Sequence, residues 1–203
     1  MSLGPAGPGL AVGLEKHWVA PDQEPMRPAD LVNPRSGEQI WFDGDESETV
    51  IWGLVPAHAA GPPLHIHDAT DENPSVIRGR LRYIIAGTVH EMGPGDRGRV
   101  PRGAPHRFEN PYDEEVELLN RVRPGIVHEV SLRLLYRALA AARPNPLALA
   151  VAFHDGDSRP ASIPLPVARG LIGLLNWLAA ITGVRTTLRN ANLPAHLRSW
   201  PRR

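Results

Sequence analysis

The 203-residue sequence contains no cysteine. Disulfides, thiolate metal ligands and a cysteine nucleophile are therefore excluded, and any bound metal must be held by nitrogen and oxygen ligands. The lack of thiols is compatible with oxidising and reducing compartments alike. A chain of this length can bury a hydrophobic core without covalent cross-links. The length predicts one domain with an appendage.

The sequence also lacks net charge, because 22 Lys and Arg balance 22 Asp and Glu. Without an overall field the chain has no electrostatic means to recruit nucleic acid, and we expect no such partner. The balance hides an asymmetry: residues 1–125 carry 12 basic and 19 acidic side chains, and residues 126–203 carry 10 basic and 3 acidic ones. The C-terminal part is therefore expected to dock on the rest of the chain or on a partner.

The N-terminal residues show no basic stretch followed by an apolar run, so we expect a cytoplasmic protein. Residues 1–28 are rich in Gly and Pro and have little apolar periodicity, which predicts a flexible arm.

From Leu31 onward, short apolar runs are broken by turn residues at intervals of about 8–12 residues, a texture typical of antiparallel sandwiches and barrels. Residues 29–125 are therefore predicted to form an all-β domain, a double-stranded β-helix or jelly-roll barrel of short strands. The expected strands lie at residues 38–43, 48–55, 63–68, 72–78, 80–86, 88–92, 97–100, 105–109 and 115–122.

After Pro124 the apolar residues recur at helical spacing, so residues 126–203 are predicted to form a helical C-terminal extension, with three helices. Its most apolar stretch, residues 165–184, is interrupted by Arg169 and Asn176. The uninterrupted run is shorter than the roughly 20 apolar residues of a membrane span. We expect a buried packing helix or a dimer contact, with peripheral membrane contact as the alternative.

The most informative local pattern is a pair of histidines, His65 and His67. Residues two apart on a strand face the same side, so both side chains can bind one ion. Glu72 follows five residues after His67, and Gly79 follows seven residues after Glu72. A second series follows at fixed intervals, consisting of Gly95, Pro101, Gly103, His106 and Asn110.

These residues resemble the two motifs of the cupin superfamily, Gly-x5-His-x-His-x3,4-Glu-x6-Gly and Gly-x5-Pro-x-Gly-x2-His-x3-Asn. The second motif is met at every fixed position. The first departs once, with Ala59 in place of the leading glycine and Gly61 two residues away. The motifs span residues 59–110, and the similarity in texture extends to about Pro124.

The resemblance implies a metal site, because the matched residues bind the metal in cupins. Here they are His65, His67, Glu72 and His106. Three imidazoles and one carboxylate suit one divalent ion of Fe, Mn, Ni, Co or Zn, and leave one or two positions for water, substrate or dioxygen. Glu72 is also a candidate catalytic base. Asn110 is expected to tie a turn rather than touch the metal.

Strand alternation predicts the walls of a substrate pocket: Tyr83, Phe108, Trp52 and Met92. The alternative for each is an ordinary core residue. Three further histidines fall outside the motif positions and are expected to be solvated or bonded to backbone, namely His58, His90 and His128.

Three function classes follow. The first is a metal-dependent oxidoreductase acting on a small organic substrate, since the ligand set resembles that of flavonol-cleaving dioxygenases. The second is a redox-neutral cyclase, isomerase or lyase, such as a polyketide cyclase of bacterial secondary metabolism, in which the ion polarises a carbonyl. The third is a binding module without turnover. The resemblance also implies a homodimer, because cupins commonly pair through barrel strands.

Overall fold

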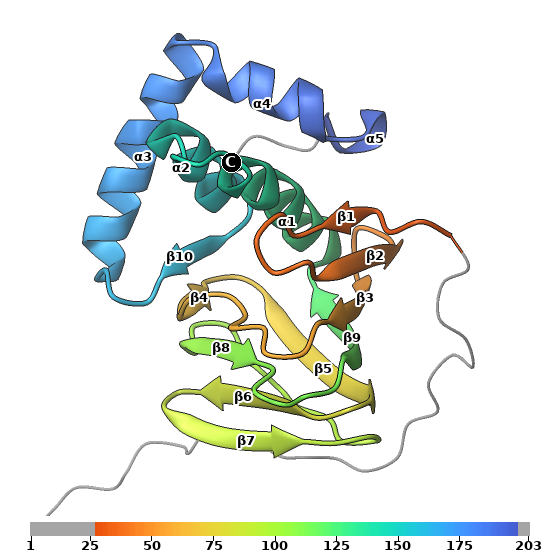
Figure 1. Ribbon diagram of the computed structural model, residues 1–203. Helices are drawn as coiled ribbons and strands as arrows, with labels where there is room; N and C mark the ends of the chain where they lie inside the picture. Colours follow the sequence, from red (N-terminus) through yellow and green to blue (C-terminus); the bar gives the residue numbers. More distant parts are fainter. Residues whose placement is uncertain (1–26, 199–203) are drawn as a thin grey trace, which may run out of the picture.

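The computed structural model describes residues 27–198 of the chain (Figure 1). The predicted N-terminal arm lies outside the described residues, apart from Arg27 and Pro28. Figure 1 shows a strand-rich barrel with helices gathered at one end of it. The helices make the all-β label too narrow, whereas the barrel itself is as predicted.

Two antiparallel sheets of five strands each build the barrel. The first has the order β1-β2-β3-β9-β5 and consists of Leu31–Val32, Gln39–Gly44, Thr49–Val55, Val116–Arg123 and Asp71–Arg78. The second has the order β10-β4-β8-β6-β7 and consists of Ser158–Pro160, His65–His67, His106–Glu109, Leu81–Ile85 and Thr88–Met92.

Most predicted strands match an observed one, but the strand expected at 97–100 is wrong. That segment makes only isolated bridges, from Val100 to Glu72 and from Arg97 to Ser75. Gly98 donates to the carbonyl of Pro74 at 2.8 Å, but proline has no N–H to complete the ladder. The short strands β1 and β10 were not predicted.

The barrel interior is an apolar cluster contributed by both sheets. Strand β5 alternates with its even-numbered residues buried, so Glu72, Pro74 and Val76 face inward together. The fully buried members of the cluster include Leu81, Tyr83, Ile85, Met92, Val100 and Val116. Glu72 therefore faces the same interior as this apolar cluster.

The turn before β4 explains the one departure from the cupin motif. Its left-handed residues are His58, at φ 58°, and Gly61, at φ 66°. A Cβ on Gly61 would lie 1.9 Å from the carbonyl oxygen of Phe108, so glycine is required there. In this turn the residue that must be glycine is therefore at position 61, and position 59 accepts alanine.

The described residues beyond β9 form five helices, where three were predicted for residues 126–203. They are α1 (Gly125–Leu139), α2 (Pro146–Asp155), α3 (Leu165–Ile181), α4 (Val184–Asn192) and the short α5 (Ala195–Arg198). Val130 and Leu134 of α1 belong to a core that the helices share. Tyr136 of α1 instead packs with Ile40 of the first sheet and donates to Glu38 Oε2 at 2.7 Å, so the helical part docks on its own barrel.

Helix α3 is not the buried packing helix that the sequence predicted. Only Ala168 and Ala179 are fully buried, and its large apolar side chains are half-buried or exposed. Five of them are 46–62% exposed: Val167, Leu171, Leu174, Trp177 and Ile181. The dimer contact and the peripheral membrane contact stay predictions. Among the described helices none alone is long and apolar enough to cross a membrane; α3 and α4 meet that test only as a pair bent by 85°.

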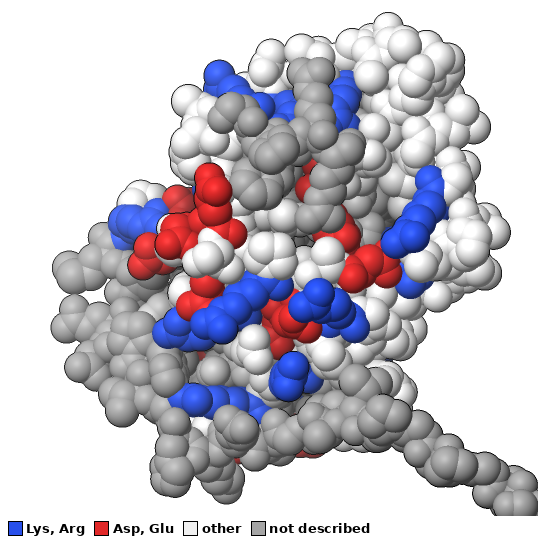
Figure 2. Space-filling model, turned by 180° about the vertical axis from the view of Figure 1, so that it is seen from behind, with Lys and Arg blue, Asp and Glu red and all other residues white. Residues whose placement is uncertain are grey.

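Acidic and basic side chains are interleaved on the outside of the barrel. Arg121 and Arg123 both bind Glu48, at 2.7 and 2.6 Å. Figure 2 shows the two signs mixed across one face of the molecule, without a large field of one sign.

Candidate metal centre

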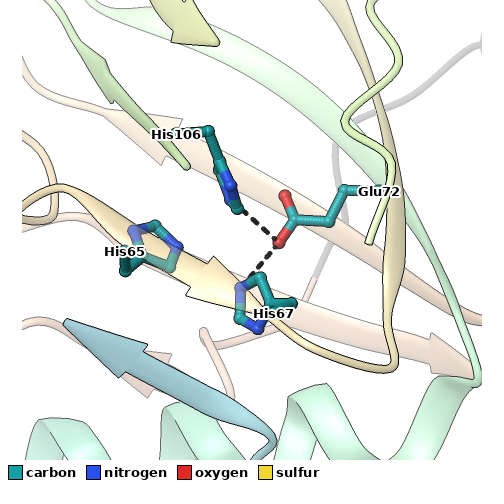
Figure 3. A group of neighbouring side chains, drawn as sticks. All are labelled: His65, His67, Glu72 and His106. Atoms are coloured by element: carbon teal, nitrogen blue, oxygen red, sulfur yellow. Dashed lines mark ion pairs between the residues drawn. The ribbon is translucent and has the colours of Figure 1, made fainter. Parts of the chain in front are cut away.

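The four candidate ligands converge from three strands (Figure 3). His65 and His67 stand on β4 and His106 on β8, and the two strands pair with His65 opposite His106. Glu72 comes from β5 of the other sheet, on the inward-facing side of that strand. Period-two alternation therefore brings both histidines of β4 to the ion position that the motif predicted.

The distances fit a single ion. Glu72 Oε1 lies 3.1 Å from His67 Nε2 and 3.7 Å from His106 Nε2. One ligand atom from each of the four residues lies within 4.8 Å of all the others. The imidazole centroids are 4.3 Å apart for His65 and His106, and 5.0 Å apart for His65 and His67.

Backbone carbonyls fix how the three imidazoles face the site. His65 Nδ1 lies 2.9 Å from Pro63 O, His106 Nδ1 lies 2.9 Å from Ala104 O, and His67 Nδ1 lies 3.3 Å from Asp157 O. A carbonyl oxygen only accepts, so each Nδ1 carries a proton, and in the neutral ring the Nε2 lone pair is available to a metal.

Glu72 is held on its other oxygen, because Asn120 Nδ2 donates to Oε2 at 2.9 Å. Burial alone would raise the pKa of Glu72, but His106 and His67 outweigh it and hold that pKa well below the usual range. Burial alone would lower the pKa of His106, but the facing Glu72 carboxylate outweighs burial and raises that pKa. The pair therefore presents an ionised carboxylate to the site.

The residues fit a divalent transition metal. The buried Nε2 atoms of His67 and His106 have no hydrogen-bond partner. A buried unpaired polar atom costs free energy, so two in one site indicate a missing partner. Three nitrogens and one oxygen are the donors that Fe, Mn, Ni, Co or Zn accept. The site can hold a metal ion, while its identity stays a prediction.

His128 is one residue that sequence reasoning misplaced, because it is buried and its Nδ1 bonds to no backbone group. It stands on α1, is buried, and puts Nδ1 3.8 Å from Glu72 Oε1 with no hydrogen-bond partner. Its ring centroid lies 4.9 Å from that of His67. Burial lowers the pKa of His128 to about 4. The available signal was its helical position, one turn before the equally buried Ser131.

Two of the predicted pocket residues share the inner face with His106. In the pairing of β6 with β8, Ile85 lies opposite His106 and Tyr83 lies opposite Phe108. The Tyr83 and Phe108 rings are 5.6 Å apart. Burial, reinforced by the charge of Glu72, raises the pKa of Tyr83 well above its usual value. Met92 belongs to the same buried cluster as Tyr83.

Trp52 is the exception, because it lies on the opposite face of the first sheet. Strand β9 pairs Asn120 with Ile51 and Leu119 with Trp52. Asn120 reaches Glu72, so the Ile51 face is the inner one and alternation turns Trp52 outward. It packs there with Trp41 and Leu119 and lines no pocket beside the metal ligands.

Three predictions for polar residues remain, those for Asn110, His58 and His90. Asn110 is fully buried and ties its turn, as expected, donating to the carbonyls of Val55, Pro56 and Glu114 at 2.8–3.2 Å. His58 is exposed and lies 3.1 Å from Asp113. His90 on β7 departs from its prediction, because its Nε2 is buried without a hydrogen-bond partner.

The family model of the cupin domain matches residues 52–122, the stretch that carries all four candidate ligands. Residues 52–122 belong to the cupin domain family. The cupin part of the chain therefore ends just before α1, and the helices lie outside the matched region.

Several solved structures are similar to the cupin part. A sugar phosphate isomerase of the cupin superfamily from Silicibacter pomeroyi is 24% identical, with 49% of this chain and 67% of that chain covered and a TM-score of 0.42. KdgF from Halomonas sp. is 18% identical, with 43% and 79% covered and a TM-score of 0.41. The Cnp3 cupin domain from Schizosaccharomyces pombe is 19% identical, with 42% and 64% covered and a TM-score of 0.40.

These similarities cover less than half of this chain, and at such identities and TM-scores they indicate no shared activity. No curated protein matches the sequence.

Proposed function

We propose that this protein is a metal-dependent cupin enzyme that acts on a small organic substrate. One divalent transition metal ion would be held by four side chains, namely His65, His67, Glu72 and His106. The observation that carries the proposal is the convergence of these groups with the Nε2 atoms of His67 and His106 buried and unpaired. When bound, the ion supplies either Lewis-acid polarisation of a carbonyl or a place for dioxygen.

Other groups of the protein orient the proposed ligands and supply apolar surface beside them. The three Nδ1–H groups hold the imidazoles in place, and Asn120 holds the carboxylate of Glu72. A carboxylate with a strongly lowered pKa is a weak base, so this geometry favours Glu72 as a ligand over Glu72 as a general base. Tyr83 and Phe108 supply apolar surface on the same inner face.

The expected reaction class is an oxidoreductase, dioxygenase-like, with a redox-neutral cyclase, isomerase or lyase as the alternative. Four protein ligands would leave open positions on a bound divalent ion, at which it would accept a substrate and dioxygen together. A binding cupin without turnover is the third outcome of the test.

The test is reconstitution of tag-free protein with Fe(II) and, separately, with Zn(II), followed by assays on a panel of small phenolic and polyketide-type compounds. Oxygen uptake by the iron form alone supports the oxidoreductase. Turnover of the zinc form under anaerobic conditions supports the redox-neutral enzyme. Retention of a compound by both forms without turnover would contradict an enzymatic function. His106→Ala is the matched control, and it should stay folded and inactive.

A further inference from the structure

Strand β10 brings the C-terminal part of the chain to the metal centre. It pairs antiparallel with β4, with Ser158 opposite His67 and Pro160 opposite His65. In the order β10-β4-β8-β6-β7, β4 would be an edge strand without it. The strand that carries two candidate ligands is therefore held from both sides, once by the cupin domain and once by residues beyond it.

The turn that precedes β10 adds contacts to the same place. The carbonyl of Asp157 accepts from His67 Nδ1, at 3.3 Å. Its carboxylate accepts from Ala69 N at 2.5 Å and from Thr70 Oγ1 at 3.2 Å, in the loop that leads from β4 to Glu72. Arg159 lies 3.2 Å from both carboxylate oxygens of Asp68. The orientation of His67 thus depends on a backbone group from outside the cupin domain.

His128 of α1 completes this arrangement from a third direction. Its Nδ1 lies 3.8 Å from Glu72 Oε1 and has no partner, and its ring packs against that of His67. It is not among the residues whose ligand atoms all lie within 4.8 Å of one another. A shift of roughly 0.6–0.9 Å would bring Nδ1–H within hydrogen-bond distance of the carboxylate. The geometry therefore suits a group that orients Glu72, as Asn120 does on the other oxygen.

We propose that His128 is a positioning residue of the metal centre, and that metal binding and docking of residues 125–160 on the barrel stabilise each other. The inference rests on the proposed metal site. If the docked segment orients His67 and Glu72, it raises metal affinity, and by linkage the bound metal must hold the segment more firmly in place. The helical part is then a component of the site as well as a cover for the barrel.

The first experiment measures Co(II) and Zn(II) affinity by competition with a chelator, and records the visible spectrum of the Co(II) form, for full-length variants. His128→Leu should weaken binding by about 10–100-fold, the usual effect of losing a group that orients a ligand. It should also alter the Co(II) spectrum. His128→Asn keeps a side-chain N–H near the same place and should restore part of the affinity.

Leu134→Ala is the matched control, because Leu134 is a buried residue of the same helix that packs among the helices and away from the site. It should loosen the packing of the helices on one another and not the docking of α1 on the barrel, so it should lower stability and leave the Co(II) spectrum and affinity unchanged. The reciprocal measurement is hydrogen exchange of the wild type with and without Zn(II). Amides of β10 and the first half of α1 should exchange more slowly with zinc, and those at the exposed face of α3 should not change.

The outcomes separate the two proposals. A wild type that binds neither ion would overturn the metal site and this inference together. If the wild type binds these ions, two results together would overturn this inference alone. One is a His128→Leu variant equal to wild type in affinity and Co(II) spectrum, and the other is hydrogen exchange in β10 that does not change with zinc.

Discussion

Two groups of buried ionisable side chains, one in the barrel and one among the helices, are satisfied in different ways. Asp155 at the end of α2 faces two arginines of α4: Arg185 Nη2 lies 2.7 Å from Oδ1, and Arg189 Nη1 contacts Oδ2. Asn176 of α3 accepts from Arg185 as well. In the barrel, Asn120 Nδ2 donates to Glu72 Oε2, and the Nε2 atoms of His67 and His106 have no hydrogen-bond partner among the described residues.

The difference shows what each group is for. Buried charges that bind one another hold elements together, and nothing else is needed to explain them. Buried ligating atoms that point at one another without bonding are explained by an ion that they share. We therefore interpret the helical cluster as structural, and the barrel cluster as the proposed metal site, although both are built from acids facing bases.

The largest expected effect is on the helical cluster. Asp155→Ala leaves Arg185 and Arg189 buried without their carboxylate, which should lower the free energy of unfolding by about 3–5 kcal/mol. Denaturant unfolding of metal-free protein measures this. Asp113→Ala, at a fully exposed carboxylate, is the control and should cause no measurable change. A small effect of Asp155→Ala would mean that the helical cluster is not structural.

The barrel cluster should respond to metal instead. At a free metal concentration 100 times the Kd, binding should raise the free energy of unfolding of the wild type by about 2.7 kcal/mol. His106→Ala should abolish the increase, while Asp155→Ala should keep it. Thermal or denaturant unfolding with and without Zn(II) makes the measurement. An equal gain for His106→Ala would place the ion elsewhere.

Acid should weaken the helical cluster in a defined window. Burial alone would raise the pKa of Asp155, but the His154 hydrogen bond and the two arginines outweigh it and hold that pKa below its usual value. A carboxyl with a lowered folded pKa stabilises the protein above its unfolded pKa, and that contribution is lost as the pH falls through the folded value. Stability should therefore fall below about pH 4. The acid dependence of Asp155→Asn should be shallower than that of the wild type.

The smallest effect is expected on the exposed face of α3. Leu174 and Trp177 are 56% and 58% exposed, so Leu174→Ser and Trp177→Ser should each change the free energy of unfolding by less than about 0.5 kcal/mol. A larger loss that depends on protein concentration would show that a second copy covers this face in solution. Sedimentation of the same variants distinguishes the two results.

The barrel cluster could be predicted in two steps. Strand alternation places His65 and His67 on one face of β4, whereas Glu72 on the other sheet and His106 on β8 were predicted through the resemblance to the cupin motifs. Trp52 was misplaced because alternation gives two faces and does not say which is inner; only the pairing with Leu119 and Asn120 decides that.

The contributions from beyond the cupin domain could not be predicted in the same way. His128 reaches Glu72 through the packing of α1 on the barrel, which no motif encodes. Strand β10 has three residues and lies about 90 residues from its partner in the sequence, since Ser158 pairs with His67. Such contacts depend on tertiary structure, and short strands carry little periodicity of their own.

The most direct test of the account is metal analysis of tag-free protein beside the double variant His65→Ala, His67→Ala. The account predicts about one transition metal ion per chain in the wild type and none in the variant, with both proteins folded by circular dichroism. Equal metal content in the two proteins, or none in the wild type after reconstitution, would contradict it.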